Sequence, residues 1–169
     1  LNSMLPASIA VQKIFKVDLE SHARFSATSR TYQYFIHPKK DPFQNESSWY
    51  YPNELDVEKM NAISKLLFEY TDFSCFSKSN TQTFTNNCRI SHAHWERKDH
   101  QLIFTILADR FLRNMVRAIV GTLIKAGTGK LDEKEFRSIL ESKDRSNAGT
   151  SVPAHGLYLT DILYPFETE

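Results

Sequence analysis

The sequence predicts a single α+β domain over residues 1–169, with a mainly antiparallel sheet and helices packed on one face. Three observations favour this class. A chain of 169 residues is long enough for one full domain. Apolar residues make up 41% of it and aromatic residues 12%, which supplies a packed core. Predicted hairpins and helices are intermixed along the chain without a strict strand–helix alternation.

Strands are expected where apolar, aromatic and β-branched residues gather, at 9–17, 31–37, 89–96, 101–107 and 157–164. Pro38 ends the second of these strands. Residues 97–100 join the third and fourth strands into a hairpin. Loops are expected over 38–53, 71–87 and 142–156, where proline or small polar residues are frequent.

Three helices are expected. Asp56 is a good N-cap for residues 57–70, whose apolar residues recur at helical spacing. Asp109 can cap a second helix over 110–126, which glycines at 127 and 129 close. Asp132 and Glu135 have the spacing of a capping box and begin a third helix that ends near Glu141.

Composition excludes several classes of protein. The charge balance, 21 basic against 20 acidic residues, gives a net charge of +1 and does not by itself indicate nucleic acid. Two cysteines are too few for a disulfide-rich secreted scaffold, so we expect a cytoplasmic protein with reduced thiols. No apolar run approaches the roughly 18 residues of a membrane helix, so no membrane partner is expected.

Two basic runs without acidic residues stand out. Arg110, Arg113 and Arg117 have i, i+3 and i+7 spacing, which places them on one side of the predicted helix. Arg117 lies deep in an apolar run, so we expect it to pair with a carboxylate or a phosphate. No acidic residue of this chain is an obvious partner, and solvated positions at the helix start are the alternative for the other two arginines.

The second run covers residues 21–40 and mixes cations with aromatic rings. It includes Arg24, Arg30 and Tyr32. Such a mixture suits RNA, because phosphates bind the cations and unpaired bases stack on the rings. The alternative is a strand whose aromatic rings enter the core and whose charges face water. The two runs together favour an anionic ligand.

Other chemistries lack their motifs. His92 and His94 follow Cys88, but alternation along a strand accounts for both histidines and no fourth ligand has a suitable spacing, so no metal site is expected. Neither cysteine lies beside a clear base. The phosphate-binding glycine loops and the Gly-x-Ser-x-Gly motif of serine hydrolases are also absent.

Four segments resemble one known family in order and spacing. They are His22-Ala-Arg-Phe-Ser-Ala27, Arg30-Thr-Tyr-Gln-Tyr34, Phe111-Leu-Arg-Asn-Met-Val-Arg-Ala-Ile-Val-Gly121 and Pro153-Ala-His-Gly-Leu-Tyr-Leu159. Over nearly the whole chain they resemble the TruA family of tRNA pseudouridine synthases. The resemblance implies isomerisation of uridine to pseudouridine in the anticodon arm of tRNA, around positions 38 to 40. It also implies a homodimer, no cofactor and no metal.

The resemblance assigns roles to individual residues. Tyr32 would stack on the target base, Arg117 would pair with the catalytic aspartate, and Leu157 would pack in the same pocket. We expect Arg24, Arg30, Arg110 and Arg113 to bind RNA. The family's Gly-Arg-Thr-Asp-Ala-Gly-Val-His motif, which carries the nucleophilic aspartate, does not occur here. The chain is therefore expected to be the C-terminal part of a longer enzyme and to be inactive alone.

Two other interpretations remain open at this stage. The first is a non-catalytic RNA-binding module of the same fold, suggested by the two basic runs. The second is a structural or dimerisation domain, suggested by the apolar helix near 111–126.

Overall fold

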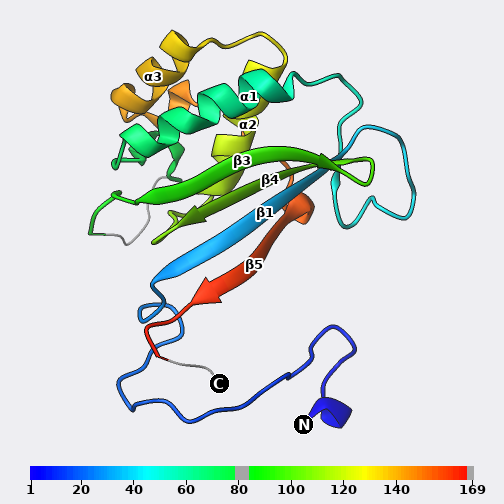
Figure 1. Cartoon of the computed structure of the whole chain (residues 1–169), viewed down its shortest axis with the longest axis vertical. Helices are drawn as coiled ribbons and strands as arrows, with labels where there is room; N and C mark the ends of the chain where they lie inside the picture. The colour runs from blue at the N-terminus through cyan, green and yellow to red at the C-terminus, as the bar shows by residue number, and fades with distance from the viewer. Residues whose placement is uncertain (79–83, 167–169) are drawn as a thin grey trace.

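The computed structural model describes residues 1–78 and 84–166. It contains a five-stranded sheet with helices on one side (Figure 1). The strands are β1 (Ser29–His37), β2 (Trp49–Tyr50), β3 (Ile90–Lys98), β4 (Gln101–Ala108) and β5 (Leu157–Leu163). The α-helices are α1 (Val57–Ser64), α2 (Met115–Gly127) and α3 (Glu133–Ser142). The predicted α+β class with a mainly antiparallel sheet is confirmed.

Strand β1 organises the sheet. One edge pairs antiparallel with β4, and the other pairs antiparallel with β5 and, at its C-terminal end, parallel with β2. Strands β3 and β4 form the predicted hairpin. The two residues of its turn, Asp99 and His100, have φ of 46° and 69°, as the favoured two-residue hairpin turn requires.

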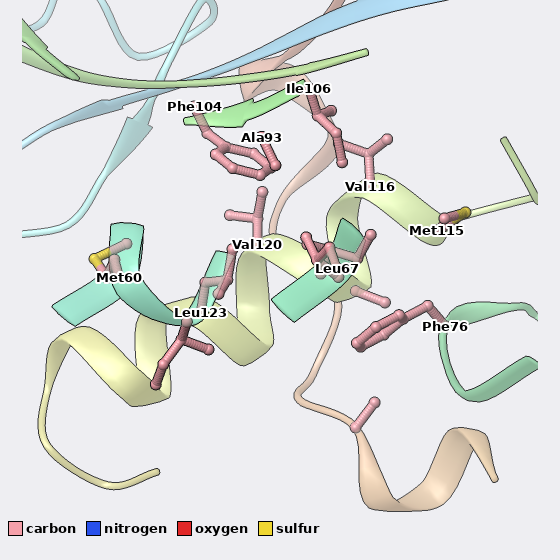
Figure 2. Close-up of a cluster of buried hydrophobic side chains, with 14 of the residues drawn as sticks. Met60, Leu67, Phe76, Ala93, Phe104, Ile106, Met115, Val116, Val120 and Leu123 are labelled. Carbon is pink, nitrogen blue, oxygen red and sulfur yellow. The ribbon is translucent and has the colours of Figure 1, made fainter. Parts of the chain in front are cut away.

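The core lies between the sheet and helices α1 and α2. Figure 2 shows Phe104, Ala93 and Ile106 pointing from the sheet toward α2, where Val116 and Val120 meet them. Alternation along each strand places these side chains on a single face. The opposite face of the sheet carries the more exposed side chains of the strands. No helix of the described residues covers that face (Figure 1).

The N-cap residues predicted from the sequence mark the starts of two helices correctly. The Asp56 side chain accepts a hydrogen bond from the backbone N–H of Lys59 at 3.0 Å, so the predicted cap of α1 is confirmed. The capping box at the start of α3 is also confirmed in both directions. The first helix is shorter than expected, because after Ser64 the chain continues as a 3₁₀ helix, Lys65–Glu69.

The second helix begins at Met115, so the predicted start at Arg110 is wrong. Asn114 has a left-handed φ of 70°, which interrupts the helix there. Before it, Leu112 is buried and the Phe111 ring makes an edge-to-face contact with Tyr32. Tertiary packing therefore holds this segment out of the helix. Arg110 and Arg113 consequently do not share a helix side with Arg117.

The predicted strand over 9–17 is also wrong. This segment has no strand partner and runs apart from the sheet (Figure 1). Four of its apolar side chains are exposed: Ile9, Ile14, Phe15 and Val17. A strand requires a neighbouring strand for its N–H and C=O groups, and no strand of the described residues pairs with this segment.

Two expected loops contain more structure than their composition suggested. Residues 49 and 50 of the 38–53 segment form β2. Within 71–87, Phe73, Cys75 and Phe76 are buried in the core, because the short 3₁₀ helix Ser74–Phe76 turns them inward. Residues 79–83 of that loop lie outside the described residues. Across the described chain, no helix is long and apolar enough to cross a membrane.

Candidate functional site

A cavity of about 1180 Å³ lies over β1 and β5 on the same side of the sheet as the helices. Its floor comes from side chains of both strands that share one face: Arg30, Tyr32, Leu157, Leu159 and Ile162. Residues 23–28 form one wall, and residues 109–116 form another. The helices cover the β3 and β4 side of this face, so the β5 side is left open for a ligand.

A β-bulge in β5 shapes the floor. The register places Tyr32 opposite Leu159 and Arg30 opposite Ile162, with a shift between Thr31 and Tyr32. Residues three apart in a regular strand point to opposite faces. The extra residue of the bulge brings both Leu159 and Ile162 to the cavity side. This was not visible in the sequence, and neither residue was predicted as part of the site.

Tyr32 and Leu157, two of the predicted pocket residues, both line this cavity. Tyr32 is half-buried and its ring lies edge-on to Phe111, with ring centroids 5.1 Å apart. Leu157 pairs with the next inward-facing residue of β1, Tyr34, and packs against the core. The cavity therefore offers an aromatic and an aliphatic surface side by side.

The four arginines predicted to bind RNA also line the cavity, but not all of them are free. Arg24 and Arg113 are exposed and Arg110 is half-buried. Arg30 points inward: its Nη1 donates to the carbonyl oxygens of Ala27 at 2.9 Å and Asp109 at 2.7 Å, and its Nη2 donates to that of Arg24. Arg30 thus holds the two walls together.

Arg117 differs from the other predicted residues because it does not line the cavity. It lies on the first turn of α2, directly after Met115 and Val116, which do. Its Nε donates to the carbonyl oxygen of Val152 at 2.6 Å. No acidic side chain of the described residues forms an ion pair with it. The partner expected from the sequence is thus not found within residues 1–78 and 84–166.

Tyr34 lies behind the cavity and has a structural role. Burial raises the pKa of its hydroxyl, and the nearby positive charge of Arg117 partly opposes this shift. The hydroxyl donates to the carbonyl oxygen of Pro153 at 2.8 Å. Tyr34 is therefore neutral at physiological pH and positions the segment that leads into β5.

The two cysteines and the paired histidines were considered from the sequence as nucleophiles and as a metal site. Burial raises the pKa of the Cys75 thiol to about 12 and that of the Cys88 thiol to about 11, so neither forms a reactive thiolate near pH 7. Both are free thiols. His92 and His94 are exposed with ring centroids 6.2 Å apart. In the described part of the chain, no group of three His, Cys, Asp or Glu is arranged to hold a metal ion.

Comparison with known proteins gives the family. A sequence model of the family described as tRNA pseudouridine synthase matches residues 65–165. The tRNA pseudouridine synthase A of Parabacteroides distasonis is 56% identical over 167 residues, which cover 99% of this chain. The enzymes of the same name from Bacteroides fragilis and Bacillus subtilis are 49% and 38% identical, over 99% and 97% of this chain.

The chain therefore belongs to the tRNA pseudouridine synthase family, as the resemblance of its motifs implied. It spans only part of each relative: 66% of the Parabacteroides distasonis protein and 67% of the other two.

Proposed function

We propose that this chain is the C-terminal part of a cytoplasmic tRNA pseudouridine synthase, with the anticodon arm, around positions 38 to 40, as its substrate. In this proposal it supplies one half of the uridine-binding cleft and is inactive alone. The observation that carries the proposal is the cavity that joins Tyr32 and Leu157 on its floor with arginines on its walls.

The chemistry explains why a chain that supplies half of the cleft would be inactive alone. A carboxylate attacks the nucleotide, the bond between the sugar and uracil N1 breaks, and the uracil rejoins the sugar through C5. The bond to the carboxylate then breaks, which regenerates the nucleophile. The C5 proton leaves and N1 gains a proton, so the reaction is an isomerisation that needs no cofactor or metal. The base must leave the helical stack to be reached. Tyr32 and Leu157 are suited to hold the detached ring from two sides.

Arg117 would act on the nucleophile. Its Nε is already used by Val152, which leaves the two terminal nitrogens of the guanidinium for a carboxylate. An arginine beside an aspartate lowers the pKa of the carboxyl group and holds it ionised. In this proposal that aspartate belongs to the part of the longer protein that this sequence does not include.

The test uses the full-length gene product and tRNA tritiated at uridine C5. Tritium release is expected from the full-length protein and not from the 169-residue chain. Arg117→Ala in the full-length protein should reduce release by about 100-fold or more, because the nucleophile loses its partner. Tritium release by the 169-residue chain would show that the nucleophile is not missing.

A non-catalytic RNA-binding module is the second candidate, since the basic and aromatic cavity walls would serve it equally well. It predicts that the full-length protein binds tRNA without releasing tritium. Homodimerisation is also proposed, on the family resemblance, and light scattering of the full-length protein would test it.

A further inference from the structure

Residues 22–28, which include the cavity wall formed by 23–28, make a turn that is held by several hydrogen bonds. The backbone N–H of His22 donates to Ser26 Oγ at 2.9 Å, and the N–H of Ser26 donates back to the His22 carbonyl oxygen. The Nδ1 atom of His22 accepts from the N–H groups of Arg24 and Phe25 at 3.0 and 3.3 Å. Four backbone N–H groups of the turn, those of His22, Arg24, Phe25 and Ser26, are therefore hydrogen-bonded within it.

The same turn is tied to the rest of the fold at three places. Arg30 binds the carbonyl oxygens of Arg24 and Ala27. The hydroxyl of Tyr164 donates to the Ala23 carbonyl oxygen at 2.8 Å, which connects the turn to the residue that follows β5. The N–H of Thr28 donates to the carbonyl oxygen of Leu163 at 2.8 Å. The turn is therefore held in one conformation against the sheet.

This rigid turn presents a phenylalanine to solvent. Phe25 is 74% exposed, yet it lines the cavity beside Arg24. The Arg24 guanidinium lies 5.4 Å from the centre of its ring, and the His22 ring lies 4.5 Å from it. Single exposed apolar side chains are common, so exposure alone does not indicate a ligand. Phe25 differs from the exposed Phe43 because it lines the cavity on a hydrogen-bonded turn. An exposed ring with a cation beside it is the pattern that binds unpaired nucleobases.

We propose that Phe25 is a stacking site for an unpaired base of the nucleotide next to the target uridine. This inference rests on the proposed function. Tyr32 is half-buried on the cavity floor, whereas Phe25 is far more exposed on the wall, so the two rings suit two different bases. Arg24 binds the phosphate between them. When the target base leaves the stack, its neighbour loses a stacking partner, and Phe25 replaces that partner.

The test compares variants of the full-length enzyme on tritiated tRNA. Phe25→Ala should raise KM for tRNA about tenfold and leave kcat nearly unchanged, since base stacking on an aromatic side chain has about that effect. Phe25→Trp should restore KM. The matched control is Phe43→Ala, because Phe43 is 96% exposed and does not line the cavity. Equal KM values for the Phe25→Ala and Phe43→Ala enzymes would overturn the inference.

A second readout does not depend on turnover. Emission from the introduced tryptophan of Phe25→Trp should be quenched by tRNA beyond the quenching seen in the wild type, whereas Phe43→Trp should show no added quenching. If tRNA leaves the emission of the Phe25→Trp enzyme unchanged, RNA does not contact this position. That result would overturn the inference. Wild-type enzyme that releases no tritium would refute the proposed function instead, so the two failures are distinguishable.

Discussion

At the scale of single residues, the ring and the hydroxyl of Tyr32 can be tested separately. Its ring contacts Phe111, and its hydroxyl has no hydrogen-bond partner within the described residues. The sequence motif identified Tyr32 and Leu157, and the structure places both in one cavity. The motif did not reveal that Arg30 would be occupied by backbone carbonyl groups, because those groups lie up to 79 residues away.

We predict that Tyr32→Phe in the full-length protein slows tritium release by about 100-fold while the affinity for tRNA stays the same. The variant keeps the ring and removes only the hydroxyl, which in the proposed function would take up the C5 proton, and positioned acid–base groups typically contribute 10²–10⁴ in rate. Tyr32→Leu should weaken both properties. A Tyr32→Phe enzyme as fast as the wild type would show that only the ring matters.

At the scale of elements, helix α2 is held by its close approach to residues 149–152. A Cβ added at Gly121 would lie 1.9 Å from the carbonyl oxygen of Thr150. The Gly149 N–H donates to Thr122 Oγ1 at 2.8 Å, and the Val152 N–H donates to the Arg117 carbonyl oxygen at 3.2 Å. This approach also fixes the Val152 carbonyl group that holds Arg117.

Gly121→Ala is therefore expected to lower the free energy of unfolding by about 3 kcal/mol or more, because backbone must move to admit the methyl group. Gly129→Ala is the control. Gly129 has a positive φ of 72° but open space around its Cα, so the expected loss is about 1 kcal/mol. Urea unfolding of the two variants measures both losses, and equal losses would contradict the close approach.

Asp72 connects the turn before β3 to the end of α3. Its carboxylate accepts from the N–H and hydroxyl of Ser74, at 3.0 and 2.6 Å, and from Lys143 Nζ at 2.9 Å. Partial burial opposes ionisation, but these three bonds outweigh it and lower the pKa of Asp72 below its usual 3.8. The resulting stability is fully present above the unfolded-state value and is lost as pH falls through the lower folded-state pKa.

Asp72→Asn should therefore unfold at a lower urea concentration than the wild type at pH 6, and this difference should shrink as the pH is lowered toward 2. Urea titrations at several pH values measure it. A difference that stays constant with pH would show that the ionised carboxylate is not what stabilises this connection.

At the scale of the whole molecule, positive charge is concentrated at the cleft although the net charge is only +1. Arg24, Arg110 and Arg113 line the cavity, and of the described residues that line it only Asp109 is acidic. Its carboxylate accepts bonds from the backbone N–H groups of Arg89 and Arg110. In the proposed function, this local positive charge would attract tRNA without help from the overall charge.

Replacing Arg24, Arg110 and Arg113 together by Gln in the full-length protein should weaken tRNA binding and flatten its salt dependence. Each lost phosphate contact reduces the slope of log K against log salt by about 0.7 to 0.9, so we expect a change of about 2 to 3. Replacing Lys65, Lys130 and Lys134, which are exposed and outside the cavity, should leave the slope nearly unchanged. Wild-type binding without any salt dependence would favour the structural or dimerisation interpretation.

Local sequence signals determined what depends on a few neighbouring residues. The caps at Asp56 and Asp132 and the β3–β4 hairpin could be predicted, because the groups that form them lie within a few positions of one another. The fold class could be predicted from the order of the expected strands and helices along the chain. The prediction of a strand over 9–17 was wrong because it depends on residues far away in the chain. Its pattern suits a strand, but a strand also needs a partner at a distance.

Only the tertiary structure decided the late start of α2, the inward orientation of Arg30 and the β5 bulge that brings Leu159 and Ile162 into the cavity. Each of these depends on contacts between residues far apart in the chain, and no pattern within one segment encodes them. The sequence alone therefore identified the family and predicted that Tyr32 and Leu157 share one pocket, and tertiary packing decided which other residues form the cavity around them.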